Sequence, residues 1–174
     1  LDLAQIESGR VAMSREAVSL ENVLNECRAL VEPLATKRGI GVSLAQLERP
    51  HYVDADRIRL RQVLINLLHN AIKYNKPAGT VAVECTLSPV NSIRISVRDT
   101  GLGLSPEQMG QLFQPFNRLG KEAGPEQGTG IGLVVVKRLM ELMGGSVGVD
   151  SHVGVGSVFW IELNLTTAPL PTIN

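Results

Sequence analysis

Three stretches of the chain repeat apolar residues with the spacing of an α-helix. The first follows Ser19, a side chain suited to capping a helix, and is expected to stop near Gly39. The second covers about residues 55–75, and the third covers about residues 130–143 and ends at a Gly-Gly pair. Each stretch puts its apolar residues on one face, so we expect three amphipathic helices that pack against a common core.

Alternation of apolar and polar residues predicts strands over residues 80–87, 93–98, 146–150 and 156–164. Residues 40–53 suggest one or two further strands, broken around Pro50. Long helices before and between antiparallel-looking strands favour an α+β fold, with one sheet and helices on one of its faces.

The composition narrows the class of protein. The chain has 174 residues, no formal net charge at pH 7, 44% hydrophobic residues and only 3% aromatic residues. A neutral chain does not favour nucleic acid or an anionic membrane as its main partner. Cys27 and Cys85 form no paired motif and fall on apolar faces, so we expect both to be structural. With neither a membrane-length apolar run nor a recognisable signal peptide, we expect a cytoplasmic domain cut from a longer protein.

One face of the helix expected at residues 55–75 has an unusual set of polar side chains. It carries Arg59, Gln62, Asn66, His69, Asn70 and Lys73. A solvated face usually holds Glu and Lys pairs rather than two asparagines one turn apart, because Asn is a modest helix former. Asn70 offers a neutral oxygen ligand that suits Mg²⁺, and Lys73 offers a point charge that suits phosphate.

Two glycine-rich segments follow. Asp99 ends a predicted strand and leads into Gly101 and Gly103, where the backbone can approach a flat or anionic ligand while the carboxylate accepts from an amino group. Residues 128–133 read Gly-Thr-Gly-Ile-Gly-Leu and precede the third helix, where backbone amides can bind phosphate. The second segment is neither a Walker A motif nor a Rossmann fingerprint. Taken alone, each segment is also typical of an ordinary turn.

In their order along the chain, these segments resemble the motifs of sensor histidine kinases. Residues 66–74 resemble the N box and residues 99–103 the first glycine box, while residues 113–118 resemble the F box and residues 128–133 the second glycine box. The resemblance covers about residues 15–165. It implies a two-layer α/β sandwich of the Bergerat (GHKL) type, with a mixed, mostly antiparallel sheet, that binds ATP and Mg²⁺.

The resemblance also implies a role for each matching residue. Asn70 would bind Mg²⁺, Lys73 would contact phosphate and Arg118 would reach the γ-phosphate, and these three are the expected catalytic residues. Asp99 would accept a hydrogen bond from the adenine amino group. The remaining nucleotide-binding residues would flank the base or hold the phosphates: Asn66, Tyr74, Gly101, Gly103, Leu104, Gly128, Thr129, Gly130, Gly132 and Leu133. Residues 119–127 would form the ATP lid.

The identity of residue 66 bears on the reaction. ATPases of the gyrase, Hsp90 and mismatch-repair type resemble one another in having a Glu four residues before the metal-binding Asn, where it activates water. Here that position is Asn66, whose amide cannot take a proton from water, so phosphoryl transfer to a protein group is favoured over hydrolysis. A GHKL-type ATPase and a nucleotide-gated interaction module without transfer activity stay open as alternatives.

The ends of the chain fit a fragment of a histidine kinase. Residues 1–14 resemble the end of the second dimerisation helix, a lead-in that anti-sigma serine kinases lack. Residues 15–165 would be the catalytic ATP-binding domain, and residues 166–174 would be a linker or tail. The expected partners are the dimerisation and phosphotransfer hairpin of the parent kinase and the receiver domain of a response regulator, with no nucleic acid and no membrane contact by this fragment.

The phosphoacceptor of the family is a histidine followed by an acidic residue. None of the three histidines fits, since His51 precedes Tyr, His69 precedes Asn and His152 precedes Val. We expect His51 and His152 to be surface or packing residues, and His69 either to neighbour the phosphates or to be solvated. The chain would hold the phosphoryl donor site and not the acceptor.

Overall fold

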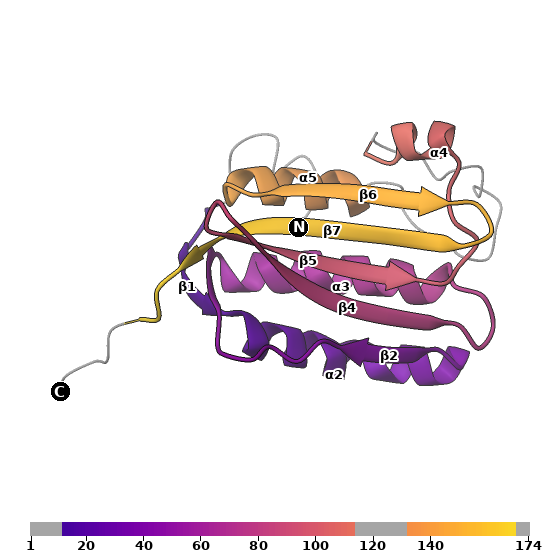
Figure 1. Ribbon diagram of the computed structural model, residues 1–174, viewed down its shortest axis with the longest axis horizontal. Coiled ribbons are helices and arrows are strands. Elements are labelled where there is room, and N and C mark those ends of the chain that lie inside the picture. Colours follow the sequence, from indigo (N-terminus) through magenta and orange to yellow (C-terminus); the bar gives the residue numbers. More distant parts are fainter. Residues whose placement is uncertain (1–11, 114–131, 170–174) are drawn as a thin grey trace.

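The structure, a computed structural model, describes residues 12–113 and 132–169 (Figure 1). One sheet forms the front layer of the view, and the long helices lie behind it on one face. In chain order the elements are β1 (Glu16–Ser19), α2 (Leu20–Arg38), β2 (Gly41–Leu44), β3 (Tyr52–Ala55), α3 (Arg57–Lys73), β4 (Thr80–Ser88), β5 (Ser92–Asp99), α4 (Pro106–Gln111), α5 (Gly132–Leu142), β6 (Ser146–His152) and β7 (Gly156–Thr166).

The sheet is built around β7. Its strands follow the order β1-β3-β7-β5-β4-β2, and β6 also pairs with β7. Strand β5 occupies one edge of β7, while β6 and β3 follow each other along the opposite edge. The β2–β4 pair is parallel and all other pairs among the described residues are antiparallel. The α+β fold expected from the sequence, with helices on one face of a mostly antiparallel sheet, is confirmed.

Capping residues define α2 and α3 close to their expected bounds. The Ser19 hydroxyl accepts a hydrogen bond from the Asn22 amide at 3.4 Å, and Gly39 ends α2 in the left-handed conformation at φ 69°. Helix α3 begins at Arg57 rather than at residue 55, because Ala55 completes β3 and Asp56 caps the helix. The capping box expected at the start of α4 is also present, between Ser105 and Gln108.

Two features of the sheet differ from expectation. Strand β1 was not predicted, because only one of its four residues, Val18, is buried and so the segment has no apolar alternation to detect. Strand β7 extends through Thr166, one residue into the segment expected to be a tail, because Thr166 pairs with Tyr52.

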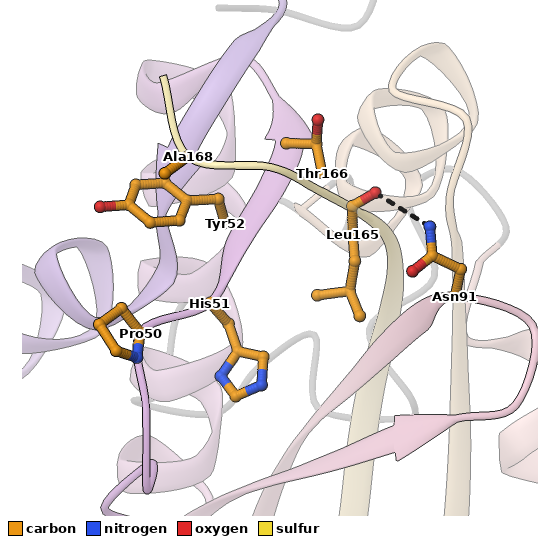
Figure 2. Close-up of a pocket in the computed structure, with 7 residues that line it drawn as sticks. All are labelled: Pro50, His51, Tyr52, Asn91, Leu165, Thr166 and Ala168. Carbon is orange, nitrogen blue, oxygen red and sulfur yellow. Dashed lines mark hydrogen bonds between the residues drawn. The ribbon is translucent and has the colours of Figure 1, made fainter. Parts of the chain in front are cut away.

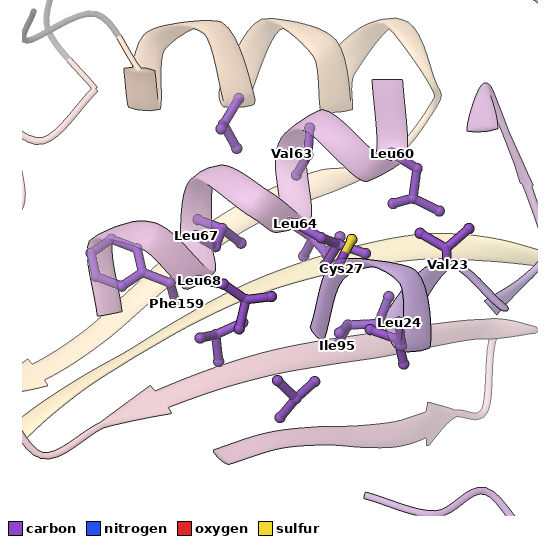
Figure 3. Close-up of a cluster of buried hydrophobic side chains, with 14 of the residues drawn as sticks. Val23, Leu24, Cys27, Leu60, Val63, Leu64, Leu67, Leu68, Ile95 and Phe159 are labelled. Carbon is purple, nitrogen blue, oxygen red and sulfur yellow. The ribbon is translucent and has the colours of Figure 1, made fainter. Parts of the chain in front are cut away.

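Helix α3 lies at the centre of the core (Figure 3). Its leucines at positions 60, 64, 67 and 68 are at most 1% exposed and pack with side chains of α2 and the sheet, such as Val23 and Ile95. The Cys27 thiol is fully buried in the same cluster, which confirms its structural assignment. The position of α3 is therefore set by the core, and its polar face is held at a fixed place relative to the sheet. None of the described helices is long and apolar enough to cross a membrane.

Candidate functional site

The polar face of α3 carries two asparagines in contact with each other. The Asn70 amide nitrogen donates to the side-chain oxygen of Asn66 at 3.4 Å, and both residues are half-buried. Gly132, the first residue of α5, lies against this pair, since a Cβ atom built on it would be 2.8 Å from Asn66 Nδ2. The structure therefore brings the first part of the N box next to the last glycine of the second glycine box.

The C-terminal end of α3 carries the charged part of the same face. The Lys73 ammonium lies 5.4 Å from the centre of the Tyr74 ring, and Arg38 of α2 donates to the Lys73 carbonyl at 2.9 Å. His69 is exposed, and loss of hydration together with the nearby Lys73 charge lowers its pKa. Both effects favour the neutral form of the imidazole.

Asp99 stands at the end of β5, where its carboxylate is oriented by two backbone amides. Its Oδ1 accepts from Gly101 N at 2.9 Å and from Ser157 N at 3.3 Å. Burial raises the pKa of the carboxyl above its ordinary value, and these two hydrogen bonds oppose the rise. Among the described residues both amides donate to Oδ1, so Oδ2 is left to accept a hydrogen bond from a ligand.

The loop after Asp99 is fixed against the end of α3. A Cβ atom at Gly101 would be 2.5 Å from the Tyr74 carbonyl oxygen, so only glycine allows this approach. The Thr100 hydroxyl donates to Asn75 Oδ1 at 3.0 Å and accepts from Thr80 N at 2.9 Å. Neither Asn75 nor Thr100 was a candidate from the sequence, where the position of Asn75 directly after the N box was the one available signal.

The other side of the loop rests on the turn between β6 and β7. Gly103 has φ 75° and lies against the His152 carbonyl, and the Gly154 amide donates to the Leu102 carbonyl at 2.7 Å. Two buried serines, Ser151 and Ser157, lie behind this contact. Neither serine was a candidate from the sequence, because neither belongs to a recognised motif.

Several expected site residues lie outside the described residues. They are Arg118, Gly128, Thr129 and Gly130, together with the expected lid at residues 119–127. Of the F box, Phe113 is described: it is half-buried, and the Lys137 ammonium of α5 lies 5.9 Å from the centre of its ring. Leu104 and Leu133 are partly buried and pack against the core.

The donor set of the site suits Mg²⁺ bound together with phosphate. Asn70 uses its amide nitrogen toward Asn66, which leaves its Oδ1 available as a neutral oxygen ligand. Among the described residues no three His, Cys, Asp or Glu side chains form a metal-binding group. A single protein oxygen completed by phosphate oxygens and water is the coordination that Mg²⁺ commonly takes with nucleotides.

A pocket of about 500 Å³ lies at the opposite end of the sheet (Figure 2). It is lined by Pro50, His51, Tyr52, Asn91, Leu165, Thr166 and Ala168. Its half-buried His51 has a buried Nδ1 atom with no hydrogen-bond partner among the described residues. The pocket contains none of the expected site residues, because Asp99 is at the other end of β5 from the turn that carries Asn91.

The part of the chain that contains α3, the loop after Asp99 and the start of α5 matches a known family. The family model described as "Histidine kinase-, DNA gyrase B-, and HSP90-like ATPase" matches residues 55–167, which is more than half of the chain. The chain belongs to this family. The match begins at the end of β3 and runs through the last residues of β7, so it includes every described part of the site.

Individual relatives within the family are sensor kinases. The sensor protein GacS of Pseudomonas syringae pv. syringae is 40% identical over 97% of this chain, and the match spans 19% of GacS. A solved structure of full-length ShkA in complex with AMPPNP is 33% identical, covering 97% of this chain and 35% of ShkA with a TM-score of 0.81. The histidine kinase ThkA, solved in complex with the response regulator protein TrrA, is 25% identical over 94% of this chain and 47% of ThkA, with a TM-score of 0.73.

The chain therefore corresponds to about a fifth of the length of GacS. Its family, fold and relatives place it among the ATP-binding catalytic domains of sensor histidine kinases. The resemblance drawn from the order of the sequence motifs is confirmed.

Proposed function

We propose that this domain binds Mg·ATP between α3, the loop after Asp99 and the start of α5, and passes the γ-phosphoryl group to a histidine of the parent kinase. The single observation that carries the proposal is Asp99. Two backbone amides orient its carboxylate and leave one oxygen for a ligand, at the point where the loop meets the N-box helix. A carboxylate held in this way is suited to accept from the amino group of adenine.

Each side chain of the site takes one task in this proposal. The glycines 101 and 103 flank the base, Asn70 binds Mg²⁺ through its amide oxygen, and Lys73 contacts phosphate. Bound Mg²⁺ would neutralise phosphate charge, and rate enhancement would come from positioning and electrostatic stabilisation. Arg118 would reach the γ-phosphate, and the amides of Gly128, Thr129, Gly130 and Gly132 would hold the phosphates.

The pair Asn66–Asn70 supports transfer to a protein group over hydrolysis. A hydrolytic site needs a base that takes a proton from water, and Asn66 has an amide at the position where the family's ATPases have a Glu. In this proposal the phosphoryl group moves to a histidine on a dimerisation hairpin and then to an aspartate of a response regulator. The solved complex of ThkA with TrrA supports a response regulator as partner. A cytoplasmic location of the domain is part of the same proposal.

Nucleotide binding is tested by calorimetric titration of the protein with AMPPNP and Mg²⁺, beside the variant Asp99→Asn. The variant keeps one oxygen that can accept from Gly101 and Ser157 but then presents an amide NH₂, a donor, to the ligand, so we expect binding to be lost or weakened at least about a hundredfold. Native affinity in Asp99→Asn would refute the adenine assignment. Absence of binding by the native protein would refute the proposed function and favour an interaction module.

Transfer is tested in the parent kinase with labelled ATP. We expect Asn70→Ala to abolish phosphorylation of the histidine while nucleotide binding persists, because the metal ligand is lost and the adenine contacts are kept. Full transfer by Asn70→Ala would refute the metal assignment. Rapid release of inorganic phosphate, with no labelled histidine, would instead support the ATPase alternative.

A further inference from the structure

A buried hydroxyl group lies behind the loop after Asp99. It belongs to Ser151 on β6, which is 6% exposed. Ser151 Oγ accepts from the Leu104 amide at 2.7 Å, donates to the Gly156 carbonyl at 3.1 Å and lies 2.7 Å from Ser157 Oγ. A serine hydroxyl has one hydrogen and two lone pairs, so these three contacts use its whole capacity. Because Ser151 gives its hydrogen to Gly156, Ser157 is the donor in the bond between the two serines.

This hydroxyl connects both ends of the loop. Leu104, the last residue of the loop, is bound to Ser151 directly. Asp99, the first residue, is bound by the Ser157 amide, and the hydroxyl of Ser157 is in turn bound to Ser151. Between these ends the loop contains two glycines, which restrict its conformation little. The separation between the Asp99 carboxylate and the rest of the loop is therefore fixed through β6 and β7.

We propose that Ser151 is a positioning residue of the nucleotide site, which sets the loop at the distance from Asp99 that an adenine base requires. This inference rests on the proposed function, since it concerns the same ligand. Ser151 does not touch the ligand, and it acts at the adenine end of the site. Its loss should weaken the binding of every adenine nucleotide alike and leave the rate of phosphoryl transfer at saturating ATP unchanged.

The test compares Ser151→Ala and Ser151→Thr with the native protein, using titration with Mg·AMPPNP and separately with ADP. Removing the hydroxyl takes away the acceptor of the Leu104 amide and of the Ser157 hydroxyl, so we expect Ser151→Ala to raise Kd about tenfold for both nucleotides. Ser151→Thr keeps the hydroxyl and should recover most of the affinity. Ser92→Ala is the matched control, because Ser92 is similarly buried, at 7% exposed, but lies at the other end of β5, and its Kd should stay within about twofold of native.

Hydrogen exchange at a single amide, read together with the Kd values, distinguishes failure of the positioning role from failure of the proposed function. Hydrogen exchange of the Leu104 amide should be faster in Ser151→Ala and unchanged in Ser92→Ala, since only the first variant removes its acceptor. Native Kd values in Ser151→Ala would overturn the positioning role while leaving the proposed function standing. A tenfold rise in Kd that Ser151→Thr and Ser92→Ala share equally would also overturn it, because it would reflect general destabilisation. Absence of nucleotide binding by the native protein would instead overturn the proposed function, and this inference with it.

Discussion

At the scale of single residues, the closest packing in the site occurs where glycines meet backbone. Gly103 and Gly154 both have positive φ, 75° and 81°, but only Gly103 lies against another chain segment, the His152 carbonyl. We expect Gly154→Ala to lower the free energy of unfolding by about 1–2 kcal/mol, the cost of the left-handed conformation. Gly103→Ala should lose roughly 1–3 kcal/mol more, because its methyl group would overlap backbone that cannot move aside cheaply.

Urea unfolding of the two glycine variants measures the difference directly. A nucleotide titration should show the same contrast, with affinity reduced in Gly103→Ala and close to native in Gly154→Ala. Equal losses of stability in the two variants would mean that the turn adjusts and that the close approach is not required.

The burial of Asp99 predicts that the stability of the protein depends on pH. The pKa of Asp99 is raised in the folded protein, so the ionised carboxylate lowers the free energy of unfolding when the pH is above that pKa. This loss of stability disappears as the pH falls through the pKa of the folded state toward the pKa of the unfolded state. Asp99→Asn should therefore raise the Tm of the nucleotide-free protein at pH 7, and this effect should vanish as the pH falls below the ordinary aspartate pKa of about 3.9. The exposed Asp150 on β6 is the control, and Asp150→Asn should not shift Tm in this way.

Nucleotide binding by the native protein should respond to pH through the same group. The ionised carboxylate accepts a hydrogen bond, so affinity is expected to be constant above the raised pKa and to fall as Asp99 takes up a proton, at a higher pH than for an ordinary aspartate. Titrations across this range would contradict the assignment if affinity rose on acidification.

At the scale of elements, α3 is secured at its first turn by Asp56. One oxygen of this buried carboxylate accepts from Arg59 N at 3.1 Å, and the other accepts from Ser14 N at 2.9 Å. Asp56→Ala should cost about 1–2 kcal/mol of unfolding free energy, since it removes a helix cap and leaves a second amide unpaired. The nearby Asp54 pairs with Arg15 on the surface, and Asp54→Ala should cost less than about 1 kcal/mol.

Chemical denaturation of the two aspartate variants decides between these expectations. Asp56→Asn, which keeps an acceptor for the cap, should lie between Asp56→Ala and the native protein. Similar losses for Asp54→Ala and Asp56→Ala would show that the cap contributes no more than a surface ion pair.

The elements also show which features could be predicted from the sequence and which could not. The long helices were predictable, because their caps and apolar periodicity are local, as at Ser19 and Gly39. Asp99 and Asn70 were candidates from the sequence because they belong to motifs with a fixed order. Ser151 was not, because its partner Leu104 is 47 residues away and no local pattern reports such a bond. Strand β1 was missed for a related reason, since its pairing with β3 is defined by the partner strand and not by its own four residues.

At the scale of the whole molecule, the rate at which a buried cysteine reacts with a thiol reagent measures opening of the fold. Burial raises the pKa of Cys27 to about 12 and that of the half-buried Cys85 to about 11, so both are protonated at neutral pH. In the variant Cys85→Ala, a thiol reagent at pH 7.5 should label Cys27 only as fast as the domain unfolds. Mg·AMPPNP should slow this labelling further, because it binds the folded state.

The labelling time course in increasing urea checks this expectation. The rate for Cys27 should rise with the same denaturant dependence as global unfolding. Rapid labelling in the absence of urea would show that α2 separates from α3 without unfolding of the sheet.

The hydrogen bond from Ser157 to Asp99 also has a consequence for biosynthesis. The two residues are 58 positions apart, so Asp99 leaves the ribosome well before the strand that will orient it. A nascent chain that ends before β7 lacks the Ser157 amide and the pairing of β7 with β5. The contact between two residues so far apart in sequence is expected to form late in folding, because closing a long loop costs entropy. A chain that ends before β7 therefore has no oriented Asp99 carboxylate. Nucleotide binding through Asp99, as proposed, should therefore be a property of the finished domain.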